Sequence, residues 1–221
     1  HTKYGEDWFI HFQDKGPYGR VCHLQPVDWS SGWPVMGNAG EPYWKFRKPK
    51  SDSKTIVNPV ETDEFDSSKL GMQWQWQNDY KESYGQATSM GFFRLFTYAL
   101  PELGDVSNLW YVPNMLLQKI PADEFTATTK LSFCSRNSDQ YVGLVCMSAE
   151  YSSVGLQRTE DGYELQIRHN PNAMRTHLTD EVLTVDTLKP TQKGTPRKGR
   201  PAEMHIKDVY LRMSIKDSKV N

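Results

Sequence analysis

The stretch DWFIHFQDKGPYGRVCHLQPVDWSSGWPVMG, residues 7–37, decides the fold class of this chain. Large apolar side chains alternate with their neighbours from Trp8 to Gln13, and a period of two residues is typical of a β-strand. Residues 14–17, Asp-Lys-Gly-Pro, predict a turn, because glycine tolerates positive φ and proline cannot continue a ladder. We therefore expect a β-hairpin at the start of the chain.

The hairpin is expected to continue into a third strand. Tyr18 to Gln25 predicts the returning strand, which Pro26 ends, and Trp29 to Met36 predicts a further turn and a short strand. Such an antiparallel meander has the size of one blade of a β-propeller. A few strands bury too little apolar surface to offset the entropy of the chain, so another body is expected to pack on this sheet.

The composition limits the kind of protein. The chain has 221 residues, of which 37% are hydrophobic and 12% aromatic, and this length suits one large domain or two small ones. The net charge of −1 creates no field that attracts nucleic acid or an anionic membrane, and no apolar run approaches the about 20 residues of a membrane span. His1 to Tyr4 does not begin a signal peptide, so we expect a mature or truncated chain.

The three cysteines cannot all pair with one another. Cys134 and Cys146 flank a turn near residues 137–140, and a tight hairpin there places Cys134 opposite a residue near Tyr141. Cys134 and Cys146 are then too far apart for a disulfide. We expect free, mostly buried thiols, which leave the redox compartment undecided.

The pattern changes after Gly37. Residues 38–60 are rich in turn-forming and basic residues and predict a linker, with aromatic side chains available to pack on a neighbouring domain. From Asp63 onwards short alternating segments recur about every ten residues, which is typical of a β-sandwich. The expected strands are 64–65, 72–77, 92–98, 115–120, 125–134, 140–148, 152–158, 163–169, 181–187 and 204–216.

Other segments of this region are expected to be structural. Trp74 and Trp76 share one face of a strand with Leu70 and Met72, which favours the sandwich core over an exposed aromatic platform. One short helix is expected near residues 121–125. The basic segment PTQKGTPRKGRP, residues 190–201, predicts a solvated loop between two strands.

Two groups of segments carry a family resemblance. WFIHFQDKGPYGRVCHLQPVDWSSGWPVMG, residues 8–37, resembles the last blade of the five-bladed β-propeller of glycoside hydrolase family 43. The β-sandwich that follows the propeller in its β-xylosidase and α-L-arabinofuranosidase members is similar to LGMQWQWQ (70–77), LWYVPNMLLQKIPADEFTATTKL (109–131) and YVGLVCMSAEYSSVGLQ (141–157).

The resemblance implies an all-β fold in which a remnant of a five-bladed propeller precedes a concanavalin-like β-sandwich, or jelly roll. The expected domains are the last blade at 1–37, a linker at 38–60 and the sandwich at 61–221. VYLRMSIKDSKVN, residues 209–221, resembles the strand that begins the last third of the sandwich, so the final strands are expected to be missing.

The same resemblance implies an inverting glycoside hydrolase that acts on xylose- or arabinose-containing plant polysaccharides or oligosaccharides. In the family the base, the acid and a third carboxylate that tunes the acid come from earlier blades, and inversion needs two of these carboxyl groups with a water between them. None of the acidic residues of this chain falls in those motifs. No catalytic residue is assigned, the chain alone is expected to be inactive, and the missing propeller portion is an expected partner.

Arg20 is the one candidate substrate-binding residue. It stands where family members carry a Gly-Arg pair at the start of the second strand of this blade, and the resemblance implies that it contacts the sugar or the catalytic acid. A guanidinium has five donors in a rigid plane, which suits vicinal hydroxyls or a carboxylate. The alternative is a structural arginine that bridges strands of the blade.

No metal site or cofactor is assigned. His11 and His23 have no metal-ligand spacing to another histidine or cysteine and are expected to be structural. Sandwiches of this kind often hold a calcium ion, but the sequence contains no dedicated loop motif for one.

Two other functions stay open. One is a non-catalytic carbohydrate-binding module, which needs an exposed aromatic platform, and the other is a scaffold that only stabilises a neighbouring chain. The sequence does not separate xyloside from arabinofuranoside specificity. The substrate class favours an extracellular or periplasmic location.

Overall fold

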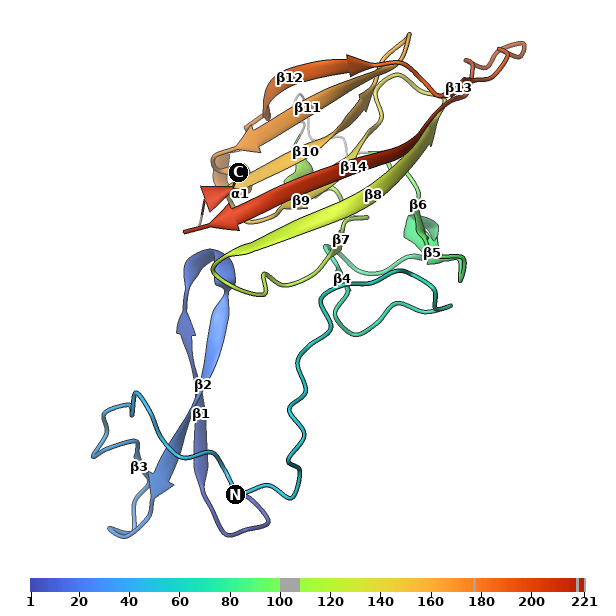
Figure 1. Cartoon of the computed structure of the whole chain (residues 1–221). Coiled ribbons are helices and arrows are strands. Elements are labelled where there is room, and N and C mark those ends of the chain that lie inside the picture. Colours follow the sequence, from blue (N-terminus) through green and yellow to red (C-terminus); the bar gives the residue numbers. More distant parts are fainter. Residues whose placement is uncertain (100–107, 177, 218, 221) are drawn as a thin grey trace. The chain divides into compact units, whose positions relative to one another are not determined.

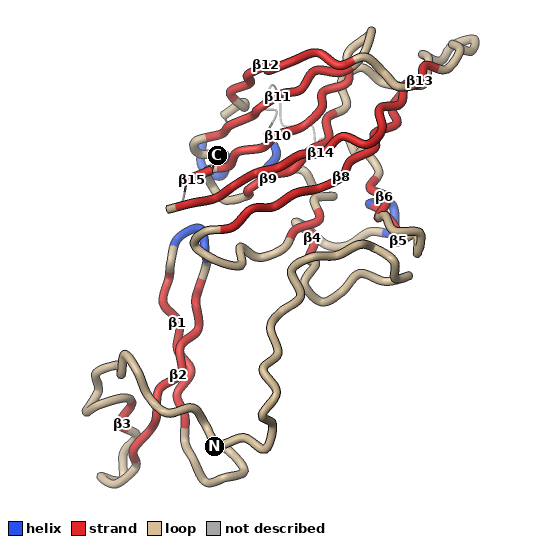
Figure 2. Tube along the Cα trace, in the orientation of Figure 1, coloured by secondary structure: helices blue, strands red, loops and turns tan. Residues whose placement is uncertain are grey.

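The computed structural model describes residues 1–99, 108–176, 178–217 and 219–220. It consists of β-strands joined by loops and single helical turns (Figure 1, Figure 2), which confirms the all-β class. The chain divides into two compact units, His1–Val60 and Glu61–Asn221. The one α-helix of the described residues, α1 (Ala173–Thr176), is a single turn, and none of their helices could cross a membrane.

The first unit is a three-stranded antiparallel meander. Its strands are β1 (Trp8–Asp14), β2 (Arg20–Asp28) and β3 (Val35–Met36), in the order β1-β2-β3, with the helical turn η1 (Gly16–Tyr18) at the hairpin tip. The expected meander is therefore confirmed.

The expected end of the second strand at Pro26 is wrong. Pro26 lies within β2 opposite Trp8. Its carbonyl accepts the Gly37 N–H at 2.9 Å, and the next residue, Val27, donates to Asp7 at 3.0 Å. Proline lacks only the donor, so it is tolerated where its carbonyl and its neighbours complete the pairing.

Part of the 38–60 segment packs back on the hairpin of its own unit. The ring of Phe46 lies 4.8 Å from that of Tyr43 and 5.9 Å from that of Trp8. The Gln25 side chain accepts the Tyr43 N–H at 2.8 Å and donates to the Tyr43 carbonyl at 3.2 Å. Trp44, between these residues, is fully exposed.

The second unit is a sandwich of two antiparallel sheets. One sheet has the order β12-β11-β10-β9, with strands β9 (Tyr141–Cys146), β10 (Tyr151–Arg158), β11 (Tyr163–Asn170) and β12 (Glu181–Leu188). In the other sheet β14 (Met204–Lys216) pairs with β8 (Phe125–Ser135), β13 (Gln192–Lys193) and β15 (Lys219–Val220).

Short elements occupy the beginning of this unit. Strand β4 (Gln75–Trp76) pairs with β7 (Leu116–Leu117), and β5 (Gly85–Ala87) pairs with β6 (Phe93–Leu95). Two helical turns accompany them, η2 (Glu82–Tyr84) and η3 (Leu109–Tyr111). The helix expected near residues 121–125 is wrong, because β8 already begins at Phe125 and the residues before it are irregular.

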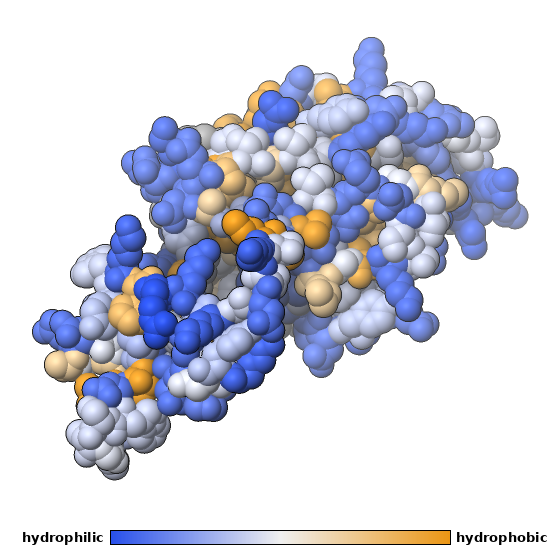
Figure 3. All heavy atoms as spheres, turned by 60° about the horizontal axis from the view of Figure 1, so that its bottom comes forward, coloured by the Kyte–Doolittle hydropathy of each residue, from blue (hydrophilic) through white to orange (hydrophobic). Residues whose placement is uncertain are grey.

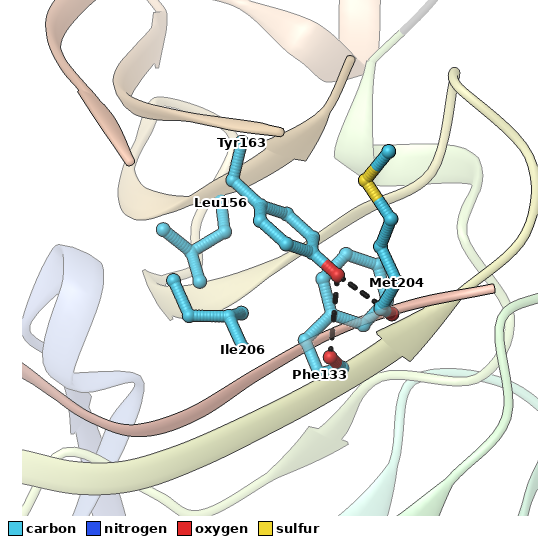
Figure 4. Packing of buried hydrophobic residues seen from close by; sticks show 5 residues of the cluster. All are labelled: Phe133, Leu156, Tyr163, Met204 and Ile206. Atoms are coloured by element: carbon cyan, nitrogen blue, oxygen red, sulfur yellow. Dashed lines mark hydrogen bonds between the residues drawn. The ribbon is translucent and has the colours of Figure 1, made fainter. Parts of the chain in front are cut away.

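The core lies between the two sheets. Phe133 of β8 and Met204 and Ile206 of β14 face Leu156 of β10 and Tyr163 of β11, all almost completely buried (Figure 4). The Tyr163 hydroxyl lies 2.8 Å from the Met204 carbonyl oxygen and 3.4 Å from that of Phe133, so this buried hydroxyl of β11 donates to the opposite sheet (Figure 4).

Strand β14 contains a bulge that changes which of its residues face the core. The pairing with β8 shifts between Ile206 and Val209, and Asp208 adopts φ 59°. Before the bulge the even-numbered residues are buried, and after it Leu211 and the following odd-numbered residues are. An extra residue on one strand has this effect, because side chains alternate with a period of two.

The first unit exposes large apolar side chains. Polar residues cover most of the visible face, with separate apolar patches among them (Figure 3). On the hairpin, Ile10 is 70% and Phe12 56% exposed on one face, and Phe9 and Val21 are exposed on the other. Neither face of this two-stranded ribbon is therefore fully covered within its own unit.

Candidate functional site

Arg20 lies at the tip of the β1–β2 hairpin. It is paired with Asp14 across the two strands, and Gly19, at φ 73°, closes the turn between them. The guanidinium carbon lies 5.1 Å from the centroid of the Phe12 ring, a cation–π contact. Because the residue is exposed, this contact orients the guanidinium plane without using up its donors.

The opposite face of the hairpin carries three stacked rings. His11 and His23 are directly opposite each other, with ring centroids 5.3 Å apart, and Phe9 stacks on His11 at 5.5 Å. Stacking of two imidazoles with a phenyl ring packs these side chains against one another on this face of the hairpin. Their structural role remains our interpretation.

A pocket in the sandwich unit is lined by aromatic and amide groups. It has a volume of about 390 Å³ and is formed by Gln77, Asn78 and residues 110–113. The η3 turn presents Trp110 and Tyr111 there, and the Asn108 side chain caps this turn by accepting the Trp110 N–H at 3.0 Å. Aromatic faces beside amide groups suit a ligand with an apolar face and hydroxyl groups, such as a sugar ring.

Trp74 and Trp76 belong to an aromatic cluster inside the sandwich unit. The ring of Phe65 lies 5.4 Å from that of Trp74 and 5.9 Å from that of Phe93, which lies 6.1 Å from Trp76. The Trp74 indole donates to Asp63 at 2.7 Å. Both tryptophans pack in this half-buried aromatic cluster, apart from the buried residues that form the core between the two sheets, so the position in the sandwich core expected for them is wrong.

Met72 does not share their environment, and that expectation is wrong. Met72 is fully exposed. Residues 72–73 form a turn and only Gln75–Trp76 are strand, so the two-residue period does not extend back to Met72.

A buried polar network ties loops to the β10–β11 pair. The Tyr151 hydroxyl donates to Asp180 and accepts the Leu109 N–H at 2.6 Å. Asn170 donates to Asp180 at 3.1 Å and to the Leu178 carbonyl at 2.8 Å. Burial, together with the Asp180 carboxylate, raises the pKa of Tyr151 far above its ordinary value, so this hydroxyl is a permanent donor that anchors the loops.

One group of side chains in the described part of the chain has the composition of a metal site: Cys134, Glu203 and His205. Cys134 and His205 are directly opposite each other in β8 and β14. The Cys134 thiol donates to Glu203 Oε1 at 2.8 Å, and His205 Nε2 lies 3.2 Å from the same oxygen and 3.6 Å from Sγ. Burial and the neighbouring Glu203 raise the pKa of Cys134 to about 11.

This cluster was not predicted from the sequence. Cys134 and Glu203 are 69 residues apart, and only the pairing of β8 with β14 brings them together. All three cysteines are free, as expected, but Cys22 and Cys134 are exposed, so their predicted burial is wrong.

Comparison with known proteins identifies the sandwich unit. Residues 62–220 match the family described as the β-xylosidase C-terminal concanavalin A-like domain, which is found in glycoside hydrolase family 43. The chain belongs to this family of C-terminal domains. The family 43 resemblance and the concanavalin-like fold expected from the sequence are thereby confirmed.

Three relatives of this family 43 chain carry enzyme names. The chain is 35% identical over 159 residues to a protein of Xylanibacter ruminicola named as a β-xylosidase, covering 69% of the chain and 29% of that protein. It is 29% identical over 182 residues to a β-xylosidase of Formosa agariphila, covering 70% and 31%. It is 26% identical over 183 residues to a non-reducing-end α-L-arabinofuranosidase of Bacteroides ovatus, covering 82% and 32%. The chain thus spans less than a third of the length of each relative.

Solved family 43 structures share the fold. The GH43 protein BlXynB from Bacillus licheniformis matches 100% of this chain and 40% of its own with a TM-score of 0.67 at 20% identity. The GH43B protein of the Bacteroides ovatus xyloglucan locus matches 100% of this chain and 43% of its own, with a TM-score of 0.65 at 19% identity.

Proposed function

We propose that this chain is the distal part of a family 43 glycoside hydrolase that cleaves xylose- or arabinose-containing plant polysaccharides or oligosaccharides. The observation that carries the proposal is the match of the sandwich to the C-terminal domain of β-xylosidases, with relatives named β-xylosidase and α-L-arabinofuranosidase. The catalytic carboxylates of the inverting reaction belong to residues outside this sequence. We further propose an extracellular or periplasmic location, where such polysaccharides are met.

In this proposal the first unit supplies the last blade of the propeller and residues 38–60 link it to the sandwich. The exposed apolar side chains on both faces of the hairpin support such a role, because a propeller covers both faces of its blades. Arg20 is the substrate-binding residue. Its exposed guanidinium, held against Phe12, has the donors to bind sugar hydroxyls or to pair with the catalytic acid.

The activity proposal is tested by comparing the chain with the longer enzyme on aryl β-xylosides and aryl α-L-arabinofuranosides. We expect the chain alone to be inactive, since it lacks the carboxylate pair, and the longer enzyme to hydrolyse at least one of these substrates. Turnover by the isolated chain at ordinary glycosidase rates would contradict the proposal.

The role of Arg20 is tested in the longer enzyme by Arg20→Ala. Loss of a donor to developing charge costs about 2–4 kcal/mol of transition-state stabilisation, a drop in kcat/KM of about 30- to 1,000-fold. Lys15→Ala in the same turn is the matched control and should retain activity. An unchanged kcat/KM in a folded Arg20→Ala enzyme would assign Arg20 a structural role.

A second candidate function is sugar binding by the sandwich unit itself. It is favoured by the pocket of Trp110, Tyr111, Gln77 and Asn78. Titration of xylo-oligosaccharides into the chain should release heat and shift tryptophan emission, and Trp110→Ala should abolish both effects while Trp44→Ala preserves them. The absence of heat and of an emission shift would leave the sandwich a structural domain.

A further inference from the structure

The outer face of the β8–β14 pair gathers three different metal-ligating groups at one end. Phe133 and Ser135 of β8, and Met204 and Ile206 of β14, are buried in the sandwich, so the residues that alternate with them point away from the core. Cys134 and His205 are such residues, and Glu203, two positions before His205, continues the same face. The cluster therefore lies outside the core, and none of its three residues lines the aromatic pocket.

We propose that Cys134, Glu203 and His205 form a binding site for a zinc ion that joins β8 to β14. A thiolate, an imidazole and a carboxylate are all ligands that Zn²⁺ accepts, and three protein ligands with one open position are a common zinc arrangement. The fourth position is left to water. Calcium and magnesium are disfavoured at this place, since both prefer oxygen ligands only.

Two of the three distances between the ligand atoms fit a tetrahedral ion. Zinc bonds of about 2.3 Å to sulfur, 2.05 Å to nitrogen and 2.0–2.1 Å to oxygen give tetrahedral edges of about 3.6 Å for S···N and about 3.3–3.4 Å for N···O. The observed separations are 3.6 Å from Cys134 Sγ to His205 Nε2 and 3.2 Å from Nε2 to Glu203 Oε1. The Sγ–Oε1 distance is 2.8 Å because the thiol donates a hydrogen bond. It has to open to about 3.5 Å once the ion replaces the proton.

Arg136 supports this arrangement from the side. Its Nε and Nη2 atoms donate to Glu203 Oε2 at 3.1 and 2.6 Å, while Oε1 is the oxygen that lies beside Cys134 and His205. Hydrogen bonds to the non-ligating atom of a metal ligand fix its orientation. Arg136 thereby holds Glu203 in place with one oxygen toward the ion.

The competing explanation is a surface ion pair centred on Glu203, with Arg136 and His205 as its cations. Such a pair has no need of a thiol, which is a weak hydrogen-bond donor. The two explanations therefore differ in whether Cys134 binds an added ion. Co²⁺ is a suitable probe, because it occupies tetrahedral zinc sites and a thiolate ligand gives it a charge-transfer absorption in the near ultraviolet.

The test uses the full chain after removal of metals with a chelator. We expect Co²⁺ to bind one per chain with the thiolate charge-transfer band, and Zn²⁺ to displace it and to raise the melting temperature. Cys134→Ser should lose the band and His205→Gln should weaken Zn²⁺ binding at least tenfold. Cys22→Ser and His169→Gln are the matched controls, since they remove an exposed cysteine and a histidine beside Glu150, and both should bind as the wild type does.

Two results would overturn the proposal: wild-type chain without a charge-transfer band at millimolar Co²⁺, or a band that persists in Cys134→Ser. If Cys134→Ser fails to fold, His205→Gln and the Zn²⁺-dependent melting temperature of the wild type decide the question. Equal Zn²⁺ affinity in wild type and His205→Gln would then refute the site.

Discussion

Tyr163→Phe removes a buried hydroxyl that joins the two sheets of the core, with little change in the volume of the side chain. Tyr163 is 1% exposed, and its hydroxyl donates to the Met204 carbonyl at 2.8 Å, with the Phe133 carbonyl as a longer second acceptor at 3.4 Å. A lost buried hydrogen bond costs about 1 kcal/mol, and more where the acceptor is left without a partner. We expect the free energy of unfolding to fall by about 1–2 kcal/mol at pH 7.

The same hydroxyl gives a second, independent readout at alkaline pH. Burial raises the pKa of Tyr163 to about 12, although the nearby Arg158 acts in the opposite direction. The unfolded tyrosine ionises near pH 10, so between about pH 10 and 12 the unfolded state releases a proton that the folded state keeps. Stability contributed by the neutral phenol is therefore present below pH 10 and falls by about 1.4 kcal/mol per pH unit above it. Tyr163→Phe lacks this contribution.

Urea unfolding of the sandwich unit, followed by circular dichroism, measures both effects. With a slope of about 2 kcal/mol per molar urea, the midpoint of Tyr163→Phe should drop by about 0.5–1 M at pH 7. Tyr210→Phe on β14 is the matched control, since Tyr210 is 66% exposed and its change should stay within about 0.5 kcal/mol. A Tyr163→Phe midpoint and alkaline slope equal to those of the wild type would refute the assignment of this bond.

Two further perturbations test the packing of each unit. Gly155→Ala should destabilise the sandwich by about 1–3 kcal/mol in the same urea assay, because its Cβ would lie 2.4 Å from the Val142 carbonyl oxygen and 2.6 Å from the Tyr141 ring; an unchanged midpoint would contradict this. The pKa of Glu6 is held below its ordinary value mainly by the hydrogen bond from the Lys50 N–H and to a smaller extent by the charge of Arg47. The stability that Glu6 adds to the first unit is therefore present above about pH 4.3 and is lost as the pH falls further. Glu6→Gln should loosen the first unit at pH 7 and remove this acid step in its amide NMR spectrum, and an acid step that persists in the variant would assign it to another group.

The sequence predicted regular strands well where each strand has one continuous inner face. In β8 the alternation from Phe125 onwards matches the observed burial along the whole strand, because local pattern and tertiary packing agree there. The alternation assumed from Met72 to Gln77 failed, since a turn interrupts it and packing of the aromatic cluster, rather than period, places Trp74. Arg20 was found only through a family resemblance, and its role remains a proposal.

Long-range register explains what the sequence did not predict. Cys134 and His205 are neighbours because β14 pairs with β8 in one particular alignment, and no local pattern specifies that alignment. The same holds for Asp180, which meets Tyr151 only through the folding of a loop onto β10. Buried polar groups of this kind are visible in a sequence only when their partners are close along the chain.

The bulge in β14 makes the strand two segments with opposite phase. Lys130 of β8 holds Asp208 by an ion pair of 2.6 Å at the point where the phase changes. A chain shortened by one residue here would keep Leu211 and the later core positions but rotate the earlier segment by half a period, so that Met204 and Ile206 faced solvent and His205 entered the apolar core. The number of residues between Ile206 and Val209 therefore matters more for the core than the identity of Asp208, and we expect relatives to have no insertion or deletion there.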